Sequence, residues 1–225
     1  MRTCRLCHNP AHLVFEEVRP FFACNVCGLI FSDCFISAEA IEKHYKDQHN
    51  NVFNWKKEAG FFIEWLKNLE WSLPLSSLSF LDYGSGGGFL TEELRRMGYA
   101  VDCYEPMLHG EFNPNKYSKA YDVIIMNEVV EHLEDINKTL DIICSLLADN
   151  GVVIIKTLLT DRIINDPENF KESFTRWWYK DDPTHISFFN FMTIEYLCHD
   201  RGRNLMVRAI SSTDNCVVLQ KMEGS

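Results

Sequence analysis

The sequence predicts an α/β fold with a parallel, doubly wound sheet, preceded by a small cysteine-rich module. Three observations lead to this prediction: strand and helix patterns alternate after about residue 77, a glycine-rich loop follows the first strand, and four cysteines form two pairs near the N-terminus. Such alternation is typical of a parallel sheet with helices on both faces. The strands are predicted at 79–83, 100–105, 122–126 and 152–158.

The helices between these strands are predicted from apolar residues that recur at helical spacing. The first helix, which Gly98 is expected to end, has a stripe made of Leu90, Leu94 and Met97. For the second helix, near 136–148, Asn150-Gly151 is a C-cap signal. Its buried stripe is predicted to consist of Ile136, Leu140, Ile143 and Leu147. The run 152–158 is apolar throughout, as expected for a strand covered on both faces.

The glycine-rich loop predicts a binding site for a nucleotide-type cofactor. It lies in the run Phe80-Leu81-Asp82-Tyr83-Gly84-Ser85-Gly86-Gly87-Gly88, and Glu105 ends the next strand. Glycines allow positive φ and a close approach of backbone to ligand, and the loop leads into a helix N-terminus, which favours anionic groups. A carboxylate about twenty residues further on can bind the two hydroxyls of a ribose.

The glycine spacing distinguishes between cofactors. The dinucleotide fingerprint has a third glycine at the position that Phe89 occupies. The pattern here is Gly84-x-Gly86-x-Gly88 after Leu-Asp-Tyr. It resembles motif I of the class I S-adenosylmethionine-dependent methyltransferases. In that family the loop backbone faces the methionine part of the cofactor, and the acidic residue corresponding to Glu105 binds the ribose.

The resemblance continues along the chain. Residues 121–133, including Asn127-Glu128-Val129-Val130-Glu131-His132, are similar to the fourth strand of the family and its exit loop, and residues 146–155 to its later helix, turn and fifth strand. It implies a Rossmann-like, seven-stranded sheet closed by an antiparallel hairpin, for which 205–210 and 216–221 are the candidates. It implies these cofactor-binding residues: Tyr45, Asp82, Gly84, Ser85, Gly86, Glu105, Pro106, Asn127 and Glu128.

The two cysteine pairs, Cys4-x-x-Cys7 and Cys24-x-x-Cys27, predict a structural zinc site. Each pair can present two thiolates to one tetrahedral ion. Two disulfides or four free thiols are the alternatives, and a reducing compartment disfavours disulfides. We therefore expect a zinc ribbon over residues 1–36, whose folding would depend on the metal.

Residues 37–76 are predicted to form a helical lid and linker before a methyltransferase domain at 77–225. Ser37 is a candidate N-cap, and Tyr45 is a candidate cofactor lid by resemblance. A further apolar stripe at helical spacing is expected to pack on the sheet and comprises Phe61, Phe62, Trp65, Leu66 and Leu69.

Two histidines are candidates for removing a proton from the methyl acceptor. His132 follows the fourth strand, and the alternative is a structural role in its loop. His185 lies in Asp182-Pro183-Thr184-His185-Ile186-Ser187-Phe188-Phe189, a segment similar to one in quinone- and sugar-modifying methyltransferases. The plain alternative is that Thr184 caps the next helix and His185 bonds to backbone. The nearby Trp177, Trp178 and Tyr179 could stack on an acceptor or belong to the core.

Composition and net charge narrow the classes of binding partner that we expect. The formal net charge is −10, which disfavours binding to nucleic acid, and no apolar stretch is long enough to span a membrane. The N-terminus has no signal-peptide pattern, so a cytoplasmic location is expected. We expect S-adenosylmethionine-dependent methylation of a small molecule on oxygen or carbon, with S-adenosylhomocysteine as product. The alternatives are RNA or protein methylation with the ribbon as recognition module, and a non-catalytic cofactor-binding scaffold.

Overall fold

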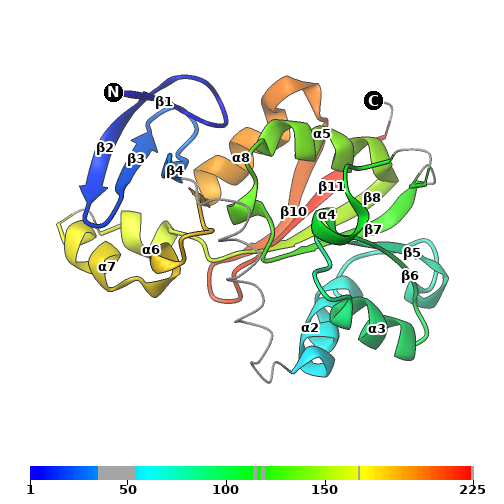
Figure 1. Ribbon diagram of the computed structural model, residues 1–225. Helices are drawn as coiled ribbons and strands as arrows, with labels where there is room; N and C mark the ends of the chain where they lie inside the picture. The colour runs from blue at the N-terminus through cyan, green and yellow to red at the C-terminus, as the bar shows by residue number, and fades with distance from the viewer. Residues whose placement is uncertain (35–53, 114–115, 118–119, 167, 224–225) are drawn as a thin grey trace.

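The computed structural model describes residues 1–34, 54–113, 116–117, 120–166 and 168–223. Two sheets lie side by side in it, a small N-terminal one and a larger central one (Figure 1). The expected helix start at Ser37 and the candidate lid residue Tyr45 lie outside the described residues. Within those residues, no helix is both long and apolar enough to cross a membrane.

The central sheet confirms the doubly wound prediction. Its order is β10-β11-β8-β7-β5-β6, with the last four strands parallel and the β10–β11 hairpin antiparallel. It has six strands in the described part of the chain, one fewer than the family resemblance implies. The strands are β5 (Ser79–Tyr83), β6 (Ala100–Tyr104), β7 (Tyr121–Asn127), β8 (Leu147–Lys156), β10 (Leu205–Ser211) and β11 (Cys216–Lys221).

Helices cover both faces of this sheet because successive strand residues point to opposite sides. Leu81 and Ile124 face α5 (Ile136–Leu146) and α8 (Phe191–His199), whereas Phe80 and Val123 face α2 (Trp55–Lys67) and α3 (Phe89–Arg96). Phe62 and Leu66 of the predicted α2 stripe are fully buried there. The shorter helices are α4 (Pro106–His109), α6 (Asp161–Ile164) and α7 (Phe170–Arg176), and the 3-10 turns are η1 (Leu75–Ser77), η2 (Val130–His132), η3 (Trp178–Asp181) and η4 (Asp200–Gly202).

Three details of the predicted helices were wrong, one each in α3, α8 and α5. Met97 is the C-cap of α3 and is 45% exposed, so it does not share the buried face of Leu90 and Leu94. Asn190, and not Thr184, caps α8, because its side chain accepts the Thr193 N–H at 2.9 Å.

Asn150-Gly151 does not cap α5. The helix ends at Leu146, and the next residue already pairs with Tyr121 as the first residue of β8. The register then shifts, so that Val123 pairs with Val152. A Cβ on Gly151 would lie 2.8 Å from the Tyr121 carbonyl oxygen. Glycine is therefore needed at position 151 because two strands approach each other closely there. From the local sequence alone, such a glycine looks the same as one that ends a helix.

The second sheet joins the N-terminal module to a distant part of the chain. Its antiparallel order is β1 (Arg2–Thr3), β2 (Pro10–Glu16), β3 (Pro20–Cys24), β4 (Ile30–Phe31) and β9 (Ser187–Phe188). Strand β3 contains Phe21 and Phe22, which are both buried. An aromatic cluster of Phe21, Phe174, Tyr179 and Phe188 fills the space between this sheet and α7. The module thus shares a sheet and a core with the segment that follows α7.

Candidate cofactor and acceptor site

The glycine loop connects β5 to α3, and each of its alternate glycines takes a left-handed backbone conformation. The φ angles are +79° at Gly84, +51° at Gly86 and +77° at Gly88, which is the N-cap of α3. A Cβ on Gly84 would lie 2.6 Å from a methyl of Val129, whereas nothing lies within 4 Å of one on Gly86 or Gly88. Gly84 is therefore needed for packing, and the other two leave open space in front of the loop.

Replacing Gly84 with alanine is expected to lower the free energy of unfolding by about 3 kcal/mol, from the positive φ and the contact with Val129 together. Chemical denaturation measures the change. Gly60→Ala is the matched control, because Gly60 lies inside α2 with nothing within 4 Å of its Cβ position. That variant is expected to gain about 1 kcal/mol from helix propensity. Equal effects of the two substitutions would contradict this account of the loop.

Glu105 lies against the loop, as the sequence predicts. It directly follows β6 and caps α4. Its Oε1 accepts the Met107 N–H at 3.2 Å, and its Oε2 accepts the Gly86 N–H at 2.9 Å. The backbone N–H groups of Gly84 and Ser85 donate to the Tyr104 carbonyl at 2.7 and 3.0 Å, which fixes the loop to the end of β6. The predicted loop residues and the predicted carboxylate are therefore together, and Pro106 follows as the first residue of α4.

Asp82 lies beneath this loop. It is only 2% exposed and accepts a hydrogen bond from the Thr91 hydroxyl at 2.6 Å. Burial raises the pKa of Asp82 to about 6. The carboxylate joins the end of β5 to α3, so its contribution to a cofactor site would be to hold the loop in shape.

Asn127 is the last residue of β7, the strand next to β5, and Glu128 follows it. The Oδ1 of Asn127 is buried and has no hydrogen-bond partner among the described residues. An orphaned acceptor of this kind fits a ligand that brings a hydrogen-bond donor. Glu128 has a φ of +52°, which is uncommon for a residue with a side chain and turns the chain out of the strand.

Glu128 also belongs to a buried network that the sequence did not predict. The Tyr179 hydroxyl lies 2.9 Å from Oε2 of Glu128, 2.5 Å from Oε1 of Glu131 and 3.2 Å from the Thr157 hydroxyl. A tyrosine hydroxyl has one proton to donate, so two such carboxylate contacts need a second proton on one carboxyl. Burial raises the pKa of Glu128 to about 8 and also raises that of Glu131. The pair therefore retains a proton at neutral pH.

The two candidate histidines meet beside this network. The rings of His132 and His185 are 4.7 Å apart between centroids, and the Nε2 of His132 is 3.9 Å from Oε1 of Glu131. Nδ1 of His132 lies 3.2 Å from the Thr184 carbonyl oxygen, and Nδ1 of His185 lies 2.8 Å from the Tyr179 carbonyl oxygen. A carbonyl only accepts, so Nδ1 carries the proton in both rings, and Nε2 is the basic atom of each neutral imidazole.

The surroundings of the two histidines differ. Burial lowers the pKa of His185 to about 4, which keeps this ring neutral. The His132 side chain is 22% exposed and that of His185 only 7%. Of the three predicted stacking aromatics, Tyr179 is buried in the core, Trp177 packs on Phe188, and Trp178 is exposed. The Glu-x-x-Glu spacing at 128 and 131 was the available sequence signal for the carboxylate pair.

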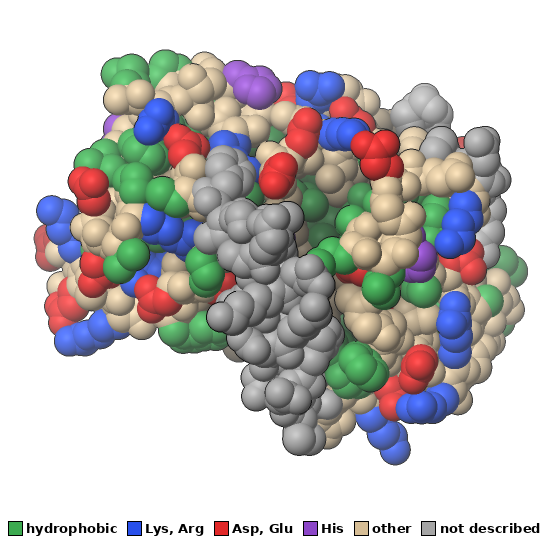
Figure 2. All heavy atoms as spheres, viewed as in Figure 1, with side chains coloured by type: hydrophobic (Ala, Val, Ile, Leu, Met, Phe, Trp, Pro, Cys, Tyr) green, Lys and Arg blue, Asp and Glu red, His purple; other side chains and the backbone are tan. Residues whose placement is uncertain are grey.

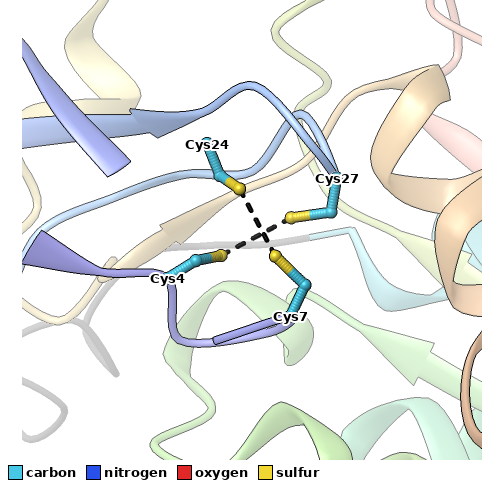
Figure 3. Close-up of side chains that lie close together, drawn as sticks. All are labelled: Cys4, Cys7, Cys24 and Cys27. Carbon is cyan, nitrogen blue, oxygen red and sulfur yellow. Dashed lines mark hydrogen bonds between the residues drawn. The ribbon is translucent and has the colours of Figure 1, made fainter. Parts of the chain in front are cut away.

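The four cysteines of the N-terminal module converge (Figure 3). Sγ atoms of Cys4 and Cys27 are 3.5 Å apart, those of Cys7 and Cys24 are 3.3 Å apart, and all four lie within 4.8 Å of one another. In both pairs the residue after the second cysteine has a positive φ and donates its N–H to the carbonyl of the first cysteine. Zn–S bonds of about 2.3 Å put tetrahedral sulfurs about 3.8 Å apart, so these residues fit a zinc ion.

Comparison with known proteins identifies the family. The sequence profile of a family described as a methyltransferase domain matches residues 37–206, well over half of the chain. The chain belongs to this methyltransferase family. The resemblance to class I methyltransferases that motif I indicates is thereby confirmed.

Curated relatives and solved structures agree with this assignment. The ubiquinone biosynthesis O-methyltransferase of Paramagnetospirillum magneticum is 34% identical over 108 residues, which cover 38% of this chain and 42% of the relative. That of Rickettsia canadensis is 27% identical over 154 residues, covering 55% and 64%. The match thus spans less than two thirds of either relative.

Two solved structures share the fold. The Burkholderia thailandensis 1,6-didemethyltoxoflavin-N1-methyltransferase, with bound S-adenosylhomocysteine, has a TM-score of 0.54 at 11% identity and covers 96% of this chain and 100% of that one. The plantazolicin methyltransferase BpumL, in complex with S-adenosylhomocysteine, has a TM-score of 0.53 at 14% identity, covering 82% and 90%. These likenesses confirm the α/β methyltransferase fold.

Proposed function

We propose that this protein transfers a methyl group from S-adenosylmethionine to a hydroxyl of a small molecule. The observation that carries the proposal is the loop in which Gly86 and Gly88 leave open space while Glu105 lies 2.9 Å from the Gly86 nitrogen. The loop backbone would hold the methionine part of the cofactor, and Glu105 its ribose. The orphaned Oδ1 of Asn127 supports this assignment, since the cofactor carries an ammonium group that can donate to it.

The acceptor side rests on the histidine pair. S-adenosylmethionine supplies an activated methyl group on a sulfonium, so the protein must align the acceptor and remove its proton. We assign proton removal to Nε2 of His132, because its ring is the more exposed of the two. His185 and Glu131 are assigned the role of holding the His132 ring in its orientation. The names of the curated relatives favour oxygen over carbon as the methylated atom.

The remaining assignments concern domains and location. We propose a zinc ribbon at residues 1–36, a lid and linker at 37–76 and the catalytic domain at 77–225, in a protein of the cytoplasm, where thiols stay reduced. An RNA substrate is less favoured: Lys and Arg alternate with Asp and Glu over the face drawn in Figure 2, and the net charge is −10.

The test is calorimetric titration of the purified protein with S-adenosylhomocysteine, with NAD as control. Binding of S-adenosylhomocysteine alone would support the proposal. A preference for NAD would contradict the interpretation of the glycine loop, and tight binding without methyl transfer to any acceptor would favour the scaffold alternative.

Replacing His132 with glutamine is expected to lower kcat by about 10²–10⁴-fold, the usual contribution of general base catalysis. Transfer of labelled methyl groups from S-adenosylmethionine to a panel of small hydroxyl-bearing compounds measures it. His199→Gln, at the exposed end of α8, is the matched control and should leave kcat unchanged. A normal kcat in the His132 variant, with unchanged cofactor affinity, would remove this histidine from the reaction.

A further inference from the structure

Arg5, in the first cysteine pair, binds two segments of the catalytic domain at once. Its Nη1 donates to the Ile186 carbonyl at 3.1 Å and to the Ser187 hydroxyl at 2.9 Å. Its Nη2 donates to the carbonyls of Leu133 and Glu134 at 3.0 and 2.9 Å. The first two acceptors belong to the segment that carries His185, and the other two directly follow His132. One guanidinium therefore connects the backbones that carry the two histidines.

Arg19, between β2 and β3, binds the other end of the same segment. Its Nη2 donates to the carbonyls of Lys180 and Asp182 at 2.5 and 2.8 Å, and its Nη1 to that of Pro183 at 3.3 Å. The guanidinium also lies over the Phe21 ring, 5.1 Å from its centroid. The two arginines thus hold the stretch from 180 to 187 near both of its ends.

Backbone hydrogen bonds hold the middle of this stretch. Strand β4 pairs with β9, and the Ser32 N–H donates to the Ile186 carbonyl at 3.1 Å. The Ile186 N–H in turn donates to the Glu131 carbonyl at 2.9 Å. His185 lies inside this set of contacts, so its place beside His132 depends on residues of the N-terminal module.

The chemistry of these contacts requires arginine. A guanidinium offers five N–H donors in a planar fork, so one side chain can satisfy several carbonyls at fixed angles, which the single ammonium of lysine cannot do. Burial lowers the pKa of both Arg5 and Arg19, and a partly buried charge is unfavourable unless it is hydrogen-bonded. These side chains are therefore built into the protein and do not form a basic surface for an external partner.

We propose that Arg5 and Arg19 are positioning residues through which the cysteine-rich module holds residues 178–188 in the conformation that binds the methyl acceptor. This inference rests on the proposed function, which places the acceptor beside the histidines. It assigns the module a role within the catalytic site, distinct from recognition of an outside partner.

The test compares Arg5→Ala with Arg2→Ala in the full chain. Arg2 belongs to the same module but pairs with Asp33 at 3.3 Å and contacts Phe22, away from the acceptor segment. In Arg5→Ala, hydrogen exchange at the Ile186 and His185 amides is expected to become about tenfold faster, the effect of losing hydrogen bonds to a charged donor. Exchange in the glycine loop and the affinity for S-adenosylhomocysteine are expected to stay at wild-type values.

A second readout reports on the site itself. Loosening the segment would expose His185, so its pKa, followed by NMR, is expected to rise from about 4 toward the ordinary value of 6.5 in Arg5→Ala. The charged or titratable groups around this ring all remain in that variant: Asp182, His132, Arg19, Glu131 and Tyr179. In Arg2→Ala the pKa should not move.

Unchanged exchange and an unchanged His185 pKa in Arg5→Ala would overturn the proposal, as would equal changes in Arg2→Ala. If Arg5→Ala fails to fold, Arg19→Ala, which lies away from the cysteines, is subjected to the hydrogen-exchange measurement with the same expected result. The His185 pKa is not compared in that variant, because loss of the Arg19 charge by itself would raise it. Wild-type protein that fails to bind S-adenosylhomocysteine would contradict the proposed function but would leave the exchange and pKa comparison intact, so the two failures are distinguishable.

Discussion

Replacing Glu105 with alanine is expected to raise the Kd for S-adenosylhomocysteine about a hundredfold, because two hydrogen bonds from a ribose to a charged acceptor contribute roughly 3 kcal/mol. Glu105 is already directed at the cofactor loop, with its Oε2 2.9 Å from the Gly86 nitrogen. Isothermal titration calorimetry of the folded variant measures the change. The global stability should alter little, since this carboxylate is not part of the buried core.

Glu111→Ala is the matched control for that variant. Glu111 is exposed shortly after α4, so its removal changes the net charge equally without touching the loop. A Glu105→Ala protein that binds as tightly as Glu111→Ala would contradict the ribose assignment. Loss of secondary structure in Glu105→Ala would instead indicate a structural role through Gly86 and Met107.

Removal of the metal is expected to unfold the N-terminal sheet while the cofactor site persists. Structural zinc contributes about 10–16 kcal/mol in small zinc modules, more than a ribbon of this size obtains from its own core. Cys24→Ser should therefore lose bound zinc and lose hydrogen-exchange protection in β1 to β4. Because β9 pairs with β4, protection at Ser187 and Phe188 should fall as well.

Cys34→Ser provides the control for the metal experiment. Cys34 is an exposed thiol outside the cluster, so this variant should keep its zinc, measured by elemental analysis, and its thermal midpoint. Equal metal content in the two variants would show that the cluster is not the zinc site. Loss of S-adenosylhomocysteine binding in Cys24→Ser would show that the two sheets cannot fold independently.

Local patterns determined most of the cofactor side. Strand periodicity located β5, β6 and β7 within about a residue, and the carboxyl ends of neighbouring parallel strands necessarily meet at one edge of a sheet. Gly84 to Gly88 and Glu105 were predicted for that reason and lie together. The convergence of the four cysteines was equally predictable, because each Cys-x-x-Cys turn is a short local structure and one tetrahedral ion would bring the two turns together.

The acceptor side was only partly predictable. His132 and His185 were both candidates from the sequence, but nothing local indicated that their rings pack 4.7 Å apart. Tyr179 was predicted as core or as a stacking surface. It is buried in the core, and its hydroxyl also bridges Glu128 and Glu131, which the sequence did not indicate. Such a network depends on side chains from separate segments meeting in a buried space, which hydrophobic periodicity does not encode.

The sequence by itself determined the fold class, the family, the cofactor loop and the cysteine cluster. Each of these depends on residues that are close together in the chain or that lie at the ends of adjacent strands. Only the tertiary structure decided that the cysteine-rich module shares a sheet with β9 and that Arg5 and Arg19 bind the backbone beside the histidines. The physical reason is that these are long-range contacts to backbone carbonyls. Every residue carries a carbonyl, so no sequence pattern identifies which of them an arginine will reach.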